Sequence, residues 1–182
     1  PGKIRFTNRD VRRAAWQSVL SGADAGVTYG AHGVWSWHHH GQSFDSFIRK
    51  GAGFSLPFDW HDALHFRGAD DMHYLKESME ELFPEGWSSD VCSSDLCTSD
   101  YVTFNDMEEI RCAHDADKYV IYVPTNVELD LSVLNISKEK YQVEIVDLET
   151  RQKYQGQWKE NEARLHLLSC YEDALVVLKK HK

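Results

Sequence analysis

The hydrophobic periodicity of the chain changes once along its length, and this change limits the folds available to it. Residues 8–23 repeat apolar side chains every four positions, which is typical of a helix with one buried face. From residue 119 onward, short runs rich in β-branched residues alternate with turn-forming polar segments. We therefore expect a first half of two helices separated by the short β-prone run GVTYG (26–30) and an all-β second half, which is an α/β plus all-β fold class.

Two helices are predicted in the first half. The first should begin near Asn8, because Thr7 and Asp10 resemble a capping box with Asp in place of Glu or Gln. Its apolar stripe consists of Val11, Ala15, Val19 and Ala23, widened by Trp16 and Leu20. The second helix is predicted over 69–83, where one face carries Met72, Leu75, Met79 and Leu82. Asp70 and Asp71 suit the positive N-terminal end of this second helix.

The second half contains strand-like runs at regular spacing. In chain order they read YVIYV, VELDLSVL, YQVEIVDL, ARLHLL and ALVVLKK. Residues 148–163, LETRQKYQGQWKENEA, are expected to add a turn, an edge strand and another turn. Short strands with no helix between them indicate a small antiparallel β-sandwich or barrel.

Residues 87–96, WSSDVCSSDL, fit neither pattern. They are too polar for a strand, carry no helical stripe and contain an isolated Cys92. Reverse-translated with ordinary codons, the segment can be written as a standard short-read sequencing adapter read in frame. A Ser/Asp-rich linker and a calcium loop are the alternatives, but the calcium-loop motif is absent. We interpret 87–96 as adapter-derived and expect a poorly packed loop there.

The overall composition excludes several classes of protein. The formal net charge of −9 argues against a nucleic-acid partner, which would require a basic face. No apolar run approaches the length needed to cross a bilayer, so no membrane partner is expected. The cysteines, Cys92, Cys97, Cys112 and Cys170, show neither CxxC pairs nor metal-ligand spacing. We therefore expect no metal and no cofactor.

The stretch with most of the chemistry is VRRAAWQSVLSGADAGVTYGAHGVWSW, residues 11–37. It contains Tyr29, His32, Trp35 and Trp37 within nine residues. Aromatic faces stack on the C–H-rich faces of sugar rings, and Tyr and His tips hydrogen-bond hydroxyl groups. The alternative is that tryptophans such as Trp16 and Trp35 fill a hydrophobic core.

This stretch, together with WHDALHFRGADDMHYLK after it, resembles the apiosidase-like glycoside hydrolases. Those enzymes are (β/α)8 TIM barrels followed by a small β-sandwich described as collagen-binding. The resemblance implies three parts: 1–86 as the C-terminal part of the barrel, 87–96 as the artefact or linker, and 97–182 as the accessory β-sandwich. It also implies that residues 9–23 precede the last barrel strand, that GVTYG (26–30) is that strand, and that Tyr29, His32, Trp35 and Trp37 bind substrate.

Hydrolysis of a glycosidic bond requires two carboxylates. The resemblance implies that both lie upstream of residue 1, so we assign no catalytic residue here and expect the fragment to be inactive, although its parent acts on plant-type or similar glycans. The aspartates of the first half lack the family's motif context and are expected to be caps or solvated charges: Asp24, Asp45, Asp59, Asp62, Asp70 and Asp71. The expected partner is a carbohydrate.

Two further questions stay open at the level of sequence. The run His38–His40 invites a metal hypothesis, but no carboxylate or cysteine lies at a companion spacing, which favours a polar loop. The β-rich half could also be a non-catalytic carbohydrate- or protein-binding module, since the fold alone does not decide function. The start PGKIRF has neither an initiator Met nor a signal peptide and is interpreted as a cut within a gene, which leaves secreted, periplasmic and cytoplasmic locations open, as well as the oligomeric state.

Overall fold

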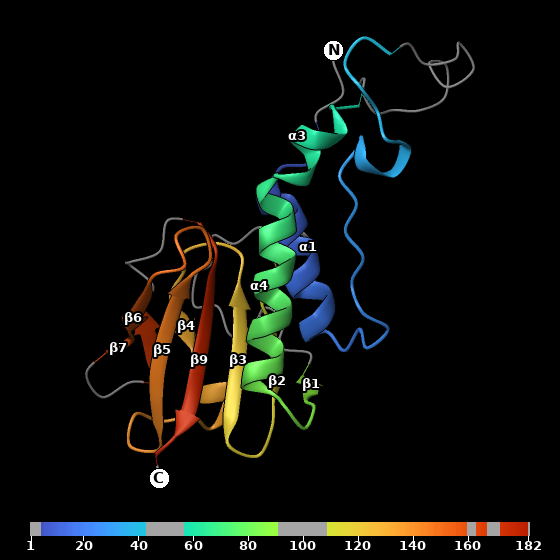
Figure 1. Cartoon of the computed structure of the whole chain (residues 1–182). Helices are drawn as coiled ribbons and strands as arrows, with labels where there is room; N and C mark the ends of the chain where they lie inside the picture. The colour runs from blue at the N-terminus through green and yellow to red at the C-terminus, as the bar shows by residue number, and fades with distance from the viewer. Residues whose placement is uncertain (1–4, 43–56, 91–108, 160–162, 167–171, 182) are drawn as a thin grey trace.

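The computed structural model describes residues 5–42, 57–90, 109–159, 163–166 and 172–181, and its elements form three layers (Figure 1). Two long helices cover one face of a six-stranded sheet, and a three-stranded sheet covers the other face. Every strand pair is antiparallel. The predicted order of helices followed by antiparallel sheets is confirmed. No helix among the described residues has the length and apolar character needed to cross a membrane.

Helix α1 (Asn8–Leu20) begins where the capping box predicted. The backbone N–H of Asp10 donates to Oγ1 of Thr7 at 3.2 Å, and the backbone N–H of Thr7 donates to Oδ2 of Asp10 at 2.8 Å. The helix ends earlier than the periodicity suggested, because the chain turns at Gly22, whose φ is 91°. Ala23 therefore lies outside the helix and is exposed, so its predicted place in the apolar stripe was wrong.

The second predicted helix is α4 (Arg67–Leu82), preceded by the short helix α3 (Trp60–Leu64) and the 3₁₀ turn η1 (Val34–Ser36). The predicted apolar face of α4 is confirmed, with Leu75 and Met79 buried against α1 and the sheet. The expectation that Asp71 is a solvated charge was wrong. This residue is 1% exposed, because the face of α4 that carries it also packs inward.

The six-stranded sheet has the order β1-β2-β3-β9-β5-β6. Its strands are β1 (Ser88–Asp90), β2 (Arg111–His114), β3 (Lys118–Val123), β5 (Tyr141–Asp147), β6 (Lys153–Gln155) and β9 (Ala174–Lys180). The three-stranded sheet has the order β4-β8-β7. It consists of β4 (Leu129–Asp130), β7 (Gln157–Trp158) and β8 (Arg164–His166), with the 3₁₀ turn η4 (Ser132–Leu134) after β4.

The central strands β3 and β9 are buried on both faces. Their register pairs Val120 with Val177 and Ile121 with Val176. Because successive side chains of a strand point to opposite faces, Val120 and Val177 lie in the core beneath the helices, whereas Ile121 and Val176 lie in the core between the two sheets. Near-continuous apolar runs are typical of strands that are covered on both sides.

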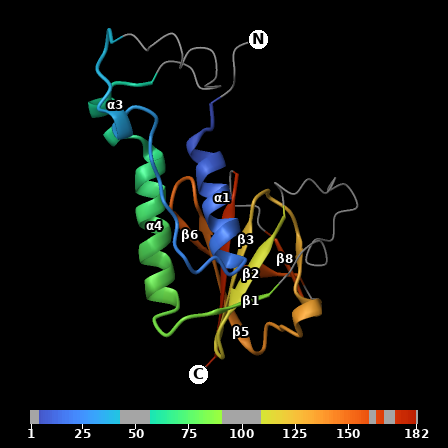
Figure 2. The same ribbon diagram turned by 90° about the vertical axis from the view of Figure 1, so that its right-hand side faces the viewer.

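The core beneath the helices joins the two halves of the chain. Trp16 of α1 is fully buried, and its ring stacks on Tyr122 of β3 with the centroids 6.5 Å apart. Met79 of α4 and Leu175 of β9 belong to the same cluster. Figure 2 shows α1 and α4 side by side over the sheet, so the helices and the sheet share one hydrophobic core.

A buried ion cluster lies at one end of this core. The guanidinium of Arg12 donates to Asp173 at 2.9 and 2.6 Å and to Asp71 at 3.2 Å, and all three side chains are almost completely buried. Tyr122 donates to Asp173, and Arg151 donates to Asp71, each at 3.0 Å. Burial lowers the pKa of Arg12, but the hydrogen bonds and the charge of Asp173 outweigh burial and raise it overall. The cluster therefore connects α1, α4 and the sheet through buried hydrogen bonds and ion pairs.

One expectation about the junction was wrong. Residues 87–96 were expected to form a loop, but Ser88–Asp90 form strand β1, because their backbone pairs with β2 in the register Ser88↔His114. The side chains of Ser88 and Ser89 are exposed, and Trp87 is partly buried against the core beneath the helices. Residues 91–96 lie outside the described part of the chain.

Residues 26–30 were expected to be a barrel strand, but they form no strand in the structure. A strand requires backbone hydrogen bonds from a neighbour, and none of the described strands pairs with this segment. Val27 is 40% exposed, which is high for a residue of a barrel strand. The described residues therefore show two long helices and two antiparallel sheets, and the barrel stays a proposal.

Candidate functional site

Two segments pack together beyond the ends of α1 and α4, away from the sheets (Figure 1). They are residues 31–42, which include η1, and residues 57–64, which include α3. Two backbone hydrogen bonds connect them: Phe58 N–H donates to the carbonyl of His32 at 3.1 Å, and Trp60 N–H donates to the carbonyl of His38 at 2.8 Å. Side chains from both segments are therefore held at fixed relative positions.

Gly33 allows these segments to approach each other. Its φ of 132° is a conformation that other residues rarely adopt, and a Cβ atom at this position would lie 2.3 Å from the carbonyl oxygen of Phe58. Both the backbone conformation and the close contact therefore require glycine.

Replacing Gly33 by alanine is expected to separate the two segments. The added methyl group would collide with backbone atoms, which cannot move aside as a flexible side chain can. The exciton signal of the Trp37–Trp60 pair in circular dichroism should therefore be lost. The control is Gly30→Ala, because no atom of the described residues, apart from its chain neighbours, lies within 4 Å of the added Cβ. An unchanged tryptophan signal in Gly33→Ala would show that the packing does not depend on this contact.

The packed segments present a group of aromatic rings, which we call the aromatic cluster: His32, Trp35, Trp37, His39, Trp60 and His61. The rings of His32 and Trp35 are stacked with centroids 6.0 Å apart, and Trp37 meets Trp60 edge to face at 4.8 Å. Trp35 is 66% and Trp37 is 62% exposed. The alternative that Trp35 fills a core was therefore wrong, whereas the same alternative holds for Trp16.

Tyr29 lies apart from the tryptophans. Its ring packs against Gly68 of α4, where a Cβ would lie only 2.8 Å from the Tyr29 hydroxyl. Burial, together with the charge of Asp71, raises the pKa of Tyr29. Tyr29 and His32 nevertheless line a common open cavity of about 600 Å³ between α1 and residues 27–32. Phe58 also lines this cavity. The structure thus brings Tyr29 and His32 to one cavity, which neither Trp35 nor Trp37 lines.

His32 connects this cavity with the aromatic cluster. Its ring is partly buried and stacks on Trp35. Burial, followed by the positive charge of Arg5 and by His38, lowers the pKa of His32. At neutral pH the ring is therefore neutral, with one nitrogen as a donor and the other as an acceptor. This state suits hydrogen bonding to hydroxyl groups.

Sequence reasoning missed the companion of the histidine run. Asp59 and His61 lie about twenty positions further along the chain, and the structure brings both of them to His39. Asp59 is the N-cap of α3, as expected of a capping aspartate. Hydrogen bonds from the side chain and the backbone N–H of His61, and from the backbone N–H of His40, lower the pKa of Asp59. The histidine run therefore does have a companion carboxylate, and it comes from a different segment of the chain.

Two solved structures share this architecture over almost the whole chain. One is a glycoside hydrolase, with a TM-score of 0.70 and 23% identity over 97% of this chain and 37% of that chain. The other is a family 5 glycoside hydrolase from Bacteroides vulgatus ATCC 8482, with a TM-score of 0.70 and 22% identity over the same shares. The chain therefore has the fold of about a third of these glycoside hydrolases, and it spans 37% of their length.

The profile of the apiosidase-like catalytic domain matches residues 1–84 of the chain. This match includes the whole aromatic cluster, α1 and α4. No curated protein matches the chain. Residues 1–84 are thus similar to apiosidase-like catalytic domains in sequence, and almost the whole chain is similar to part of two glycoside hydrolases in fold.

Proposed function

We propose that the chain is part of a glycoside hydrolase of the apiosidase-like kind, and that its aromatic cluster and the adjacent His32 cavity contribute to the carbohydrate-binding surface. The observation that carries the proposal is the exposure of Trp35 and Trp37 within the segment that resembles the family. Trp35 stacks on His32 and Trp37 meets Trp60 edge to face, yet both indoles stay largely exposed and accessible to a ligand. Rigid exposed tryptophans of this kind are suited to stacking on sugar rings.

The proposed role of this chain by itself is binding without hydrolysis. Glycoside hydrolysis uses a proton-donating carboxyl group and a second carboxylate across the scissile bond. Beside the aromatic cluster lie Asp59, which accepts the hydrogen bonds of His61 and His40, and Asp62, whose carboxylate lies 3.3 Å from His40. Both carboxylates are thus engaged with neighbouring groups, which favours structural roles for them.

The proposed domain division places 1–86 in the barrel, 87–96 in a junction of adapter origin and 97–182 in an accessory sandwich. The alternative of an independent binding module requires the sandwich to be stable alone. One face of its larger sheet carries Val120, Tyr122 and Val177, which pack against α1 and α4. Removing the helices would expose this apolar face, so packing favours an accessory domain that stays attached to the first half.

Replacing Trp35 by alanine is expected to weaken binding of plant-type oligosaccharides. Loss of one stacking contact of about 1.4 kcal/mol corresponds to roughly 10-fold in affinity. Isothermal titration with the unmodified chain and the variant measures this ratio. The control is Val133→Ala, an exposed apolar residue on the sandwich. Equal losses in both variants would contradict the assignment of the binding surface, and sugar released from an aryl glycoside by the purified chain would contradict the non-hydrolytic role.

A further inference from the structure

Three potential metal ligands meet at one side of the aromatic cluster, and two of them, His39 and His61, belong to it. One ligand atom from each of His39, Asp59 and His61 lies within 4.8 Å of the others. Nδ1 of His61 is 2.8 Å from Oδ1 of Asp59, and Nδ1 of His39 is 3.8 Å from Oδ2 of the same carboxylate. The ligand atoms of a bound transition metal are separated by about 3 Å, given bonds of about 2.0–2.2 Å, so only small side-chain movements are required.

The neighbours of these residues hold them in place. The backbone N–H of His40 donates to Oδ2 of Asp59 at 3.1 Å, which orients the carboxylate. The centroid of the Trp60 ring lies 3.7 Å from that of His61 and 6.3 Å from that of His39. Trp60 thus packs against both imidazoles. Surrounding contacts of this kind orient metal ligands and increase affinity. The site therefore has support beyond the three ligands themselves.

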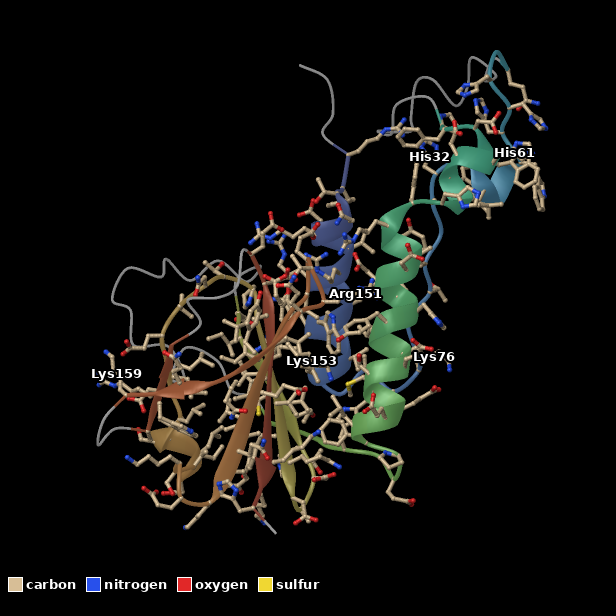
Figure 3. The ribbon with its side chains drawn as sticks, turned by 60° about the vertical axis from the view of Figure 1, so that its left-hand side comes forward. His32, His61, Lys76, Arg151, Lys153 and Lys159 are labelled. Atoms are coloured by element: carbon tan, nitrogen blue, oxygen red, sulfur yellow. The ribbon has the colours of Figure 1, made fainter. Side chains whose placement is uncertain are left out.

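The exposure of the three side chains determines the kind of site. Asp59 is 12% exposed at the base, whereas His39 and His61 are 54% and 61% exposed at the rim (Figure 3 labels His61). Two imidazoles and one carboxylate suit Zn²⁺, Co²⁺, Ni²⁺ or Cu²⁺, whereas Ca²⁺ and Mg²⁺ prefer sites made of oxygen atoms. Three protein ligands on one side leave the solvent side for water or for an oxygen atom of a ligand.

We propose that His39, Asp59 and His61 bind one divalent transition-metal ion, with Zn²⁺ as the probe of choice. The ion connects residues 38–42 with the start of α3 and therefore stabilises the aromatic cluster. Its open side faces solvent, where it can hold water or a polar group of a bound ligand. The site does not depend on hydrolytic activity.

The test is a titration of the unmodified, tag-free chain with ZnCl₂ by isothermal titration calorimetry, with Co²⁺ absorbance as an independent signal. One equivalent is expected to bind. His39→Ala and His61→Ala should each weaken binding by about 10-fold or more, because each removes a ligand. Both residues are exposed, so these variants are expected to fold, and circular dichroism verifies this.

Two matched variants exclude adventitious binding by surface histidines. His40→Ala changes the neighbour in the same histidine run, and His73→Ala removes an exposed histidine that pairs with Glu77 on α4. Both should retain the affinity of the unmodified chain. The proposal is overturned by the absence of one-to-one binding, by full binding in His39→Ala and His61→Ala, or by loss of binding in His40→Ala with retention in His39→Ala.

Discussion

Replacing Arg12 by methionine is expected to lower the free energy of unfolding by about 3–5 kcal/mol, because removal of one partner leaves a buried charge uncompensated. The methionine fills a similar volume, but the buried Asp173 loses its cation and keeps the hydrogen bond from Tyr122, whereas Asp71 keeps its ion pair with Arg151. Urea denaturation followed by circular dichroism measures the change. The effect should be among the largest of any single substitution in the chain, since the cluster connects both helices with the sheet.

Two further variants identify the cause of this loss. Arg9→Met removes an arginine of the same helix whose ion pair with Glu172 is partly exposed, and its effect should stay below about 1 kcal/mol. The double variant Arg12→Met/Asp173→Asn should lose less stability than the sum of the losses in the two single variants. The reason is that neutralising Asp173 removes a buried charge that would otherwise lack its cation. A loss below about 1 kcal/mol in Arg12→Met would show that water compensates the buried carboxylates.

Replacing Trp16 by alanine is expected to lower the free energy of unfolding by about 3–5 kcal/mol. The ring is fully buried between α1 and β3, and its removal leaves a cavity next to Tyr122. Because α1, α4 and the sheet share this core, the helices and the sheet should still unfold in one transition. Urea denaturation gives the loss, and hydrogen exchange in β9 reports whether the sheet is destabilised together with the helices.

A tryptophan in a different environment provides the control. Trp35→Ala removes a side chain that is 66% exposed and should change stability by no more than about 0.5 kcal/mol. If Trp16→Ala destabilised the helices but left protection of β9 unchanged, the two halves would be energetically independent. That outcome would contradict the shared core.

The helices could be predicted because their signals are local. Thr7 and Asp10 form a cap within four residues, and the stripe of α4 repeats within one segment. The burial of Asp71 could not be predicted from a local pattern. Its burial depends on Arg12 and Arg151, which lie 59 and 80 positions away in the sequence. Ion pairs between residues so far apart in the chain leave no periodic pattern in the sequence.

One sequence pattern could have predicted that the larger sheet is covered on both faces. The runs at 119–123 and 174–178 are apolar without alternation, and strands of this kind are covered on both faces. This pattern indicates that something packs on the outer face of the sandwich, and the nearest amphipathic candidates were the two helices. The strand β2 was missed because RCAH has little β-branched character, and its partners decide its conformation.

The candidate site was predictable only in part. The aromatic residues at 29–37 form a dense local pattern, and the structure places His32 and Trp35 in a stacked pair and Trp37 in an edge-to-face pair with Trp60. The convergence of His39 with Asp59 and His61 depends on the close approach at Gly33, which is a contact between segments 25 positions apart. Spacing rules for metal ligands apply within a helix or a hairpin, and this site is neither.

Strand β1 shows that a strand at the edge of a sheet can form with few requirements on its side chains. Ser88–Asp90 join the sheet through main-chain hydrogen bonds to β2, and these bonds form with almost any side chains. A short strand of serine and aspartate is also a poor template for a second chain, because polar and charged edges discourage association between sheets. The exposed side chains of Ser88 and Ser89 can therefore be exchanged for other polar groups without change to either hydrophobic core, whereas Trp87 beside them contacts the core beneath the helices.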